Sequence, residues 1–191
     1  MLKRTLLIVA IALIWITVAG AQQDKSQRPS PPAQAQCKFS DGKTISLDYS
    51  SPRVHDPKTH ELRKIFGGLV PYGEVWRTGA NEATTLVTNE NLFAAKTNIP
   101  AGSYTIFTLP TADKWTLIIS KHTGEWGVPY KYESEELARV PMTVSKTSAP
   151  VENFTISFDQ TGGGCTMQLS WENTQASVEF TEKNADVPMK Q

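Results

Sequence analysis

Hydrophobic and polar residues alternate with a period of two along most of the chain after residue 43. The alternation is clear at 44–50 (TISLDYS) and at 115–120 (WTLIIS), where Ile118 makes the segment apolar on both faces. Such alternation is typical of half-buried β-strands. Further alternating positions are Val140, Met142 and Val144; Phe154, Ile156 and Phe158; Cys165, Met167, Leu169 and Trp171; and Ala176, Val178 and Phe180. Shorter strands are predicted at Thr84–Thr88, Leu92–Lys96 and Ser103–Leu109.

Turn-forming residues separate these segments. Gly162–Gly164 is predicted to join one pair of strands, and Glu172–Thr174 is predicted to close the last hairpin. Eight or nine short, regularly spaced strands predict an all-β fold, a single antiparallel β-sandwich or flattened barrel. Helix is expected only in two short stretches, His60–Ile65 and Ser134–Ala138.

The N-terminus has the pattern of an export signal. Lys3 and Arg4 precede the uncharged apolar run Leu6–Ala19, and Ala19-Gly20-Ala21 gives the small-x-small pattern that signal peptidase cuts. The apolar run is about 14 residues long, whereas a membrane-spanning helix needs roughly 20. Residues 1–21 are therefore predicted to be a signal peptide and the protein to be exported, periplasmic or secreted, with an uncleaved anchor as the alternative.

The predicted mature chain divides into a leader, a domain and a tail. Residues 22–36 are rich in proline and glutamine and lack large apolar residues, so they are expected to form a flexible leader. Residues 37–183 are expected to form the β-sandwich domain and 184–191 a frayed tail. The whole chain has 19 basic and 19 acidic residues, and losing Lys3 and Arg4 leaves 17 basic residues. Nucleic acid is therefore not expected as a partner, and no stable membrane insertion is expected after signal cleavage.

Cysteine and histidine content limits the possible chemistry. In an exported protein, Cys37 and Cys165 are expected to form a disulfide. The spacing of His55 and His60 does not place them on one helical face, and joining them with His122 would need three loops to converge, so no metal site is predicted. Neither a nucleophile-elbow motif nor a Walker loop is present, and no cofactor is expected. The sequence gives no indication of the oligomeric state.

The segment 65–84 (IFGGLVPYGEVWRTGANEAT) differs most from the regular strand pattern of the rest of the chain. It combines five glycine or proline residues with aromatic side chains that can stack, an arginine that can donate two parallel hydrogen bonds, and a carboxylate that can titrate. Arg77 suits a carboxylate, a phosphate or the edge of a sugar, Asn81 adds an amide, and Glu82 adds an acceptor or general base. The structural alternative is that Arg77 and Glu82 form an ion pair that braces an irregular loop beside a buried Trp76.

Aromatic residues at 126–132 (WGVPYKY) form a second candidate feature. They either stack on a sugar or proline, or cover one open end of the sandwich. We take as candidate ligand-binding residues Tyr72, Trp76, Arg77, Asn81, Glu82 and Trp126. Glu82, Glu125 and Glu172 are further candidates for a carboxylate pair that cleaves glycosidic bonds, although their separation cannot be inferred from sequence.

Several blocks of this chain together resemble the exported bacterial domain-of-unknown-function family 2911. They are SPR (51–53), the segment 65–84, IPAGSYTIFTLP (99–110), the WTLIIS strand, Trp126-Gly127, VENFTISF (151–158) and LSWENT (169–174). The resemblance covers roughly residues 45–181. It implies a secreted or periplasmic β-rich domain, and it carries no catalytic residues onto this chain.

The function expected from the sequence is a binding or envelope-associated module, without enzymatic activity, for a small polar ligand, a sugar or a peptide. One alternative is a hydrolase or lyase that acts on an envelope or extracellular polymer, with Glu82 as acid/base and Arg77 as electrostatic clamp. The other is a structural domain without a ligand.

Overall fold

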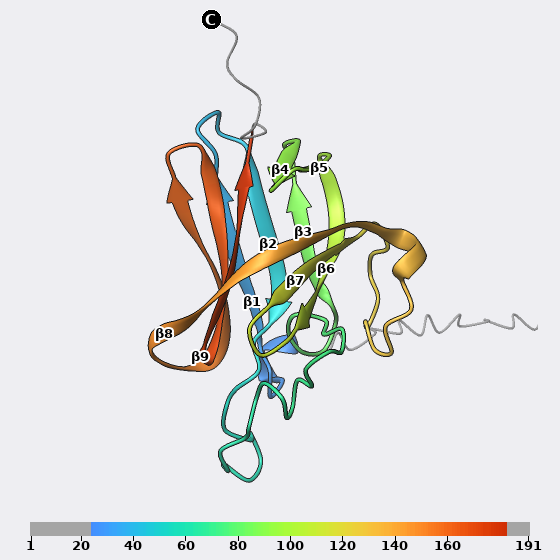
Figure 1. The fold of residues 1–191 in the computed structure, drawn as a ribbon. Coiled ribbons are helices and arrows are strands. Elements are labelled where there is room, and N and C mark those ends of the chain that lie inside the picture. The colour runs from blue at the N-terminus through green and yellow to red at the C-terminus, as the bar shows by residue number, and fades with distance from the viewer. Residues whose placement is uncertain (1–23, 183–191) are drawn as a thin grey trace, which may run out of the picture.

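The computed structural model describes residues 24–182, and these form nine antiparallel strands in one continuous hydrogen-bonded order, β1-β2-β3-β6-β7-β8-β9-β4-β5 (Figure 1). The order is not closed into a barrel, so the predicted all-β, sandwich-like fold is confirmed. The strands are β1 (Pro32–Lys38), β2 (Thr44–Ser50), β3 (Thr84–Thr88), β4 (Leu92–Ala94), β5 (Thr97–Ile99), β6 (Gly102–Pro110), β7 (Trp115–Ser120), β8 (Glu136–Thr161) and β9 (Gly164–Thr181).

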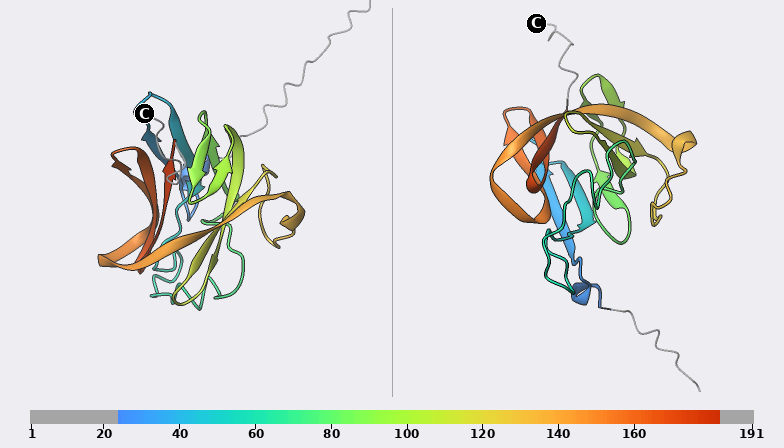
Figure 2. Two further views of the ribbon diagram at one scale, coloured as in Figure 1. Left: turned by 45° about the horizontal axis from the view of Figure 1, so that its top comes forward. Right: turned by 60° about the horizontal axis from the view of Figure 1, so that its bottom comes forward.

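The long strand β8 connects the two halves of the fold. It pairs with β7 as far as Met142 and with β9 from Thr143 onwards. One half therefore contains β1, β2, β3, β6 and β7, and the other contains β9, β4 and β5 (Figure 2). Inward-facing residues of both halves form one hydrophobic core, which includes Ile45, Leu86, Leu117, Phe154 and Met167.

Two pairs of segments predicted as separate strands prove to be single longer strands. The segments around Met142 and Ile156 both belong to β8, and Glu172–Thr174 lies inside β9 instead of closing a turn. Glu172 has φ 54°, and the β8–β9 register shifts there. A residue in the left-handed region at a register shift bends a strand without ending it. The Gly162–Gly164 turn joins β8 to β9 as predicted.

Neither predicted helix forms. Residues 60–65 are irregular, with His60 at φ 61°, and the predicted helix at Ser134–Ala138 is replaced by a single 3-10 turn, Glu133–Glu135, followed at once by β8. A second 3-10 turn, Lys25–Gln27, lies near the N-terminal limit of the described residues. Helices of one or two turns are marginal without tertiary support, and here pairing with β7 is available instead.

The predicted leader is wrong for residues 32–36, because β1 begins at Pro32 and pairs with β2 along its whole length. Its small residues Ala33 and Ala35 are half-buried and pack against the core. The ladder of main-chain hydrogen bonds to β2 therefore orders a segment whose side chains contribute little hydrophobic burial. The predicted signal peptide and tail lie outside the described residues.

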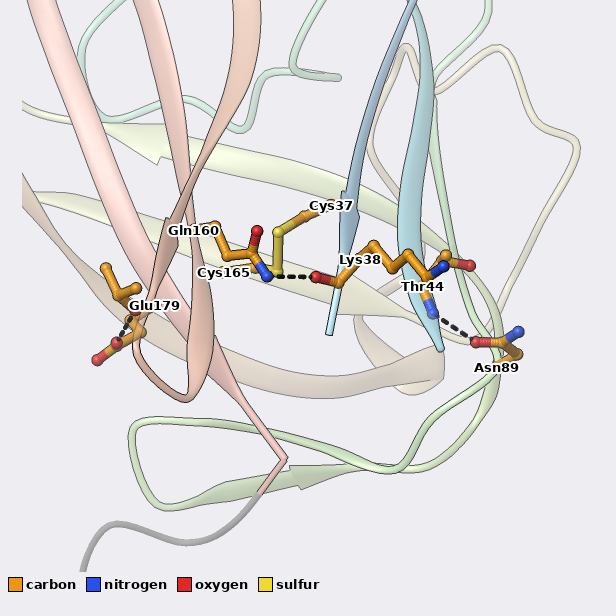
Figure 3. The surroundings of a disulfide bond; sticks show 8 residues. Cys37, Lys38, Thr44, Asn89, Gln160, Cys165 and Glu179 are labelled. Carbon is orange, nitrogen blue, oxygen red and sulfur yellow. Dashed lines mark hydrogen bonds between the residues drawn. A yellow bond between two sulfur atoms is a disulfide. The ribbon is translucent and has the colours of Figure 1, made fainter. Parts of the chain in front are cut away.

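The predicted disulfide between Cys37 and Cys165 is confirmed, with Cα atoms 6.2 Å apart. It joins β1 to β9, and Figure 3 shows the Gln160 amide beside it, which donates to the Lys38 carbonyl oxygen at 2.8 Å. Since β1 is an edge strand of the first half, this bond fixes that edge to the opposite half of the fold. Among residues 24–182 no helix is long and apolar enough to cross a membrane.

Candidate functional site

The irregular connection 51–83 and the N-terminal residues from Asp24 gather at the end of the strands opposite the β4–β5 hairpin (Figure 1, Figure 2). Two main-chain bonds dock this connection on β6: Trp76 N–H donates to the Thr108 carbonyl at 2.7 Å, and Thr108 N–H donates back at 2.8 Å. A tight turn at Ile65–Val70 precedes it, with Gly67 at φ 74°. The predicted segment 65–84 is thus anchored at both ends and irregular between.

The loop from Trp76 to Thr84 is cross-braced by short polar contacts. The Thr84 hydroxyl donates to the Thr78 carbonyl at 2.7 Å, and the Ala80 N–H donates to the Ser50 carbonyl at 3.2 Å. Thr78 is fully buried at φ 55°. A β-branched residue in the left-handed region is strained, and such strain persists only where its surroundings fix it. The loop is therefore rigid, and its strain is of the kind found at ligand sites.

Trp76 belongs largely to the core. Its ring stacks on Trp171 with centroids 6.0 Å apart and planes 20° apart, and it meets Phe154 edge-on at 4.9 Å. Its indole N–H donates to the Gly79 carbonyl at 2.9 Å. Because that donor is occupied, the part of Trp76 that is not covered offers an apolar surface to a ligand.

Arg77 is half-buried and does not pair with Glu82 among the described ion pairs. Its Nη1 donates to the carbonyls of Asn81 at 2.6 Å and Trp126 at 3.1 Å, and its guanidinium carbon lies 5.2 Å from the centre of the Trp126 ring. Burial lowers the pKa of Arg77, and the charge of Glu82 opposes this effect. Arg77 therefore links the two predicted loops through their main chains while Trp126 stays exposed.

Glu82 and Asn81 hold the N-terminal segment. The Glu82 carboxylate accepts from Arg28 at 2.8 and 2.9 Å and lies 3.2 Å from the Lys25 ammonium. The Asn81 amide donates to the Ser30 carbonyl at 2.9 Å. The Arg28 hydrogen bonds are the largest cause that lowers the pKa of Glu82 to about 2, helped by its own backbone N–H and by Lys25.

A cavity of about 410 Å³ opens beside this loop. Of the predicted residues, Trp76 and Arg77 line it, whereas Tyr72, Asn81 and Trp126 do not. The remaining lining residues are Pro29, Ser30, Pro52, Arg53, Pro57, Arg63, Leu69, Val70, Pro71, Glu74, Val75, Gly79, Ala80, Val128 and Trp171. Sequence reasoning missed Arg53 and Arg63. The prolines beside or near them, at 52 and 57, are a signal of rigid loops that could have drawn attention to them.

Tyr72 is exposed and its ring packs beside Gly67, where an added Cβ would come within 2.9 Å of it. Sequence reasoning expected this tyrosine to face a ligand. The contact explains instead why a residue without a side chain occupies position 67.

Glu82 lines a different cavity, also of about 410 Å³, together with Glu125, Asp48, Lys25 and Arg28. Glu125 is 9% exposed, and neither of its carboxylate oxygens has a hydrogen-bond partner among the described residues. Two of the three glutamates considered from sequence therefore border one space. Glu172 borders neither of the two cavities.

The remaining aromatic residues of 126–132 cover the outer face of β6 and β7. The Tyr130 ring meets Phe107 edge-on at 4.8 Å, and Tyr132 stacks on Phe107 at 5.9 Å. Phe107 and Ile118 form a second small core there with Ala83. This packing explains why the WTLIIS strand is apolar on both faces.

The histidines are spread over separate contacts. His55 Nδ1 lies 2.8 Å from a Glu152 carboxylate oxygen, and His122 stacks on Tyr132 at 4.8 Å. In the part of the chain from 24 to 182, no three His, Cys, Asp or Glu side chains are grouped so as to hold a metal ion.

Comparison with known proteins gives one match. A family model described as "Protein of unknown function (DUF2911)" matches residues 30–180, which include every strand from β1 to β8 and nearly all of β9. No curated protein and no solved structure matches the chain.

Proposed function

This chain belongs to the DUF2911 family of proteins of unknown function, and we propose that it is an exported module that binds a small organic ligand in the cavity lined by Trp76 and Arg77. Export is supported by the signal-like pattern of residues 1–21 and is compatible with the Cys37–Cys165 disulfide.

The observation that carries the proposal is the cavity itself. Its volume of about 410 Å³ lies in the range of small-molecule sites, and apolar side chains predominate with a few polar groups among them. The half-buried Trp76 contributes ring surface and stacks on Trp171, which is 1% exposed; the indole N–H groups of both are occupied by carbonyls, at 2.9 and 3.3 Å. A flat or hydrocarbon part of a ligand gains burial against such a surface without leaving a protein donor unpaired.

The second support is preorganisation. The walls contain Pro52, Pro57 and Pro71 and the cross-braced loop around Thr78, so little chain entropy remains to be lost when a ligand binds. A loop held this firmly, with a strained residue at its centre, suits recognition better than a spacer role.

The competing hydrolase or lyase function has one observation in its favour, the shared cavity of Glu82 and Glu125. Two features favour binding over it. Arg28 and Lys25 occupy the Glu82 carboxylate, and its pKa of about 2 makes it a poor proton donor or acceptor near neutral pH. Arg77, the assigned electrostatic clamp, lines the other cavity.

A fragment screen tests the binding function. We expect small aromatic compounds to raise the melting temperature of the protein and to shift the indole N–H resonances of Trp76 and Trp171. Ala80 lines the cavity, so Ala80→Leu should fill part of it and remove both effects. Ala149→Leu makes the same change at an exposed position of β8 and should preserve them. If no fragment shifts these resonances, or if Ala80→Leu binds as well as the wild type, the proposed function is wrong.

A further inference from the structure

We propose that the ligand of this cavity carries a carboxylate, and that Arg53 is the residue that recognises it; this rests on the binding function proposed above. The starting observation is charge. Three arginines, Arg53, Arg63 and Arg77, line the cavity against a single acidic residue, Glu74. An anion is therefore attracted to this space and a cation is repelled from it.

The hydrogen-bond partners of two of these arginines are neutral carbonyl oxygens. Arg77 donates from Nη1 to two carbonyl oxygens, and its Nε and Nη2 have no partner among residues 24–182. Arg63 donates from Nε to the Val54 carbonyl at 3.3 Å and from Nη2 to the Arg53 carbonyl. The Asp56 carboxylate forms an ion pair with Arg63 Nη1 at 3.9 Å, which is beyond hydrogen-bond distance, and the charge of Glu82 acts on Arg77. Neither guanidinium donates a hydrogen bond to a carboxylate of residues 24–182, so both keep N–H donors for a ligand oxyanion.

Arg53 has the most freedom. Its side chain is exposed, and within the described residues it makes no hydrogen bond and no ion pair. The nearby Glu152 carboxylate accepts from the His55 backbone N–H at 3.0 Å and lies 2.8 Å from the His55 ring nitrogen, and Arg53 acts on it through its charge without a hydrogen bond. The full planar donor fork of Arg53 is thus available at the edge of the cavity, where it suits two-point recognition of a carboxylate.

Elsewhere the same chain neutralises its arginines. Arg139 donates from Nε and Nη2 to the two oxygens of Glu136 at 2.7 and 2.8 Å, and Arg28 donates to both oxygens of Glu82. Both arginines outside the cavity are thus hydrogen-bonded to a carboxylate of residues 24–182. The three arginines of the cavity lack such a bond among the same residues, so a ligand carboxylate can supply it.

The placement of these groups defines the ligand class. The half-buried Trp76 ring, which stacks on the buried Trp171, receives an apolar, preferably flat, part, and the arginines receive an oxyanion attached to it. A guanidinium fork binds two oxygens of a carboxylate or of a phosphate; the carboxylate is the group proposed, and the test below distinguishes it from a phosphate. An aryl-substituted carboxylic acid is the simplest compound of this class.

Matched probes test the proposal. The dissociation constants of 3-phenylpropionate, 3-phenylpropionamide and phenyl phosphate are measured by calorimetry for the wild type, Arg53→Gln, Arg53→Lys and the control Lys146→Gln. Lys146 is exposed on β8 and outside the cavity, so its variant removes one positive charge without touching the site. We expect the acid to bind wild type at least about tenfold more tightly than the amide, since hydrogen bonds to charged groups are the stronger ones.

In Arg53→Gln this preference should fall markedly, with the remainder coming from Arg63 and Arg77, while the affinity for the amide stays unchanged, because the Arg53 side chain makes no hydrogen bond or ion pair within residues 24–182. Arg53→Lys should keep more of the preference than Arg53→Gln, and Lys146→Gln should keep all of it. Equal binding of acid and amide to the wild type would overturn the carboxylate assignment, and a preference undiminished in Arg53→Gln would overturn the role of Arg53; both results would leave the binding function intact. Tighter binding of phenyl phosphate than of the acid would also overturn the carboxylate assignment, in favour of a phosphoryl ligand. Failure of all three probes, together with the absence of fragment hits, would remove the binding function as well.

Discussion

Removal of the disulfide is the change whose energetic effect follows most directly from the fold. Cys37 lies on the edge strand β1 and Cys165 on β9, and the two are 128 residues apart in sequence. The bond closes a loop that includes nearly every element of the domain. The double substitution Cys37→Ala and Cys165→Ala therefore restores almost all of the conformational freedom of the unfolded chain.

The chain-entropy relation gives an upper value of about 5 kcal/mol for a loop of this size, and native disulfides in small secreted domains contribute about 2–5 kcal/mol. Both cysteines are buried, at 7% and 0% exposure, so truncation to alanine also loses some packing. We expect the free energy of unfolding to fall by about 3–5 kcal/mol.

Urea unfolding of the oxidised wild type and of the double variant measures this loss. The variant should also show a larger dependence on urea concentration, because its unfolded state exposes more surface. Hydrogen exchange should rise first in β1, where Ala33 and Ala35 supply little hydrophobic contact. A loss below about 1 kcal/mol, or faster exchange spread evenly over all strands, would refute the view that the disulfide holds β1 to the second half.

Three further outcomes are expected from single substitutions. Glu82 has a pKa of about 2 against an ordinary value of 4.5, so its ion pairs stabilise the fold above pH 4.5 and this stabilisation is lost as the pH falls toward 2. At neutral pH the wild type should be more stable than Glu82→Gln by about 1 kcal/mol, because the carboxylate is partly exposed. This difference in the free energy of unfolding should disappear between pH 4.5 and pH 2. Glu125→Met should raise the melting temperature, because it removes a buried carboxylate that has no hydrogen-bond partner for either oxygen among the described residues. A lower melting temperature would indicate that this carboxylate has a structural role. Gly124 and Gly127 both have φ 83°, but only at Gly127 would an added Cβ contact neighbouring atoms, at 3.0–3.1 Å. Gly127→Ala should therefore lower the melting temperature more than Gly124→Ala. Equal losses would show that the positive φ alone determines both effects.

The fold class was predictable because period-two alternation identifies half-buried strands directly. The lengths of the strands could not be predicted in the same way. The inward positions of the last strand are odd from Cys165 to Trp171 and even from Ala176 to Phe180, and this change of parity reflects the left-handed residue Glu172 within β9. We interpreted the polar residues at the change as a turn. A parity change of this kind is equally the sequence signature of a bulge within one strand.

The first strand was missed for a physical reason. Between Pro32 and Lys38 the inward positions carry Ala33, Ala35 and Cys37, so the alternation is present but its hydrophobic contrast is weak. Main-chain pairing with β2 and the bond to Cys165 supply what the side chains do not. Neither contribution is visible in a local window of sequence.

Of the six candidate binding residues, only Trp76 and Arg77 line the cavity beside the segment 65–84, and their role in binding stays a prediction. Glu82 was separated from them because its partners, Lys25 and Arg28, come from residues assigned to the flexible leader. Arg53 was missed because its place at the cavity and its lack of a hydrogen-bonded acid among residues 24–182 follow only from the three-dimensional arrangement.

The central claim is that the cavity beside Trp76 holds a small ligand. A crystal structure of the protein soaked with the tightest-binding fragment tests it most directly. We expect electron density for the fragment between the Trp76 ring and the Arg53 guanidinium, with the loop from Trp76 to Thr84 unmoved. Density for the fragment elsewhere on the surface, with this cavity vacant or closed by its own side chains, would contradict the claim.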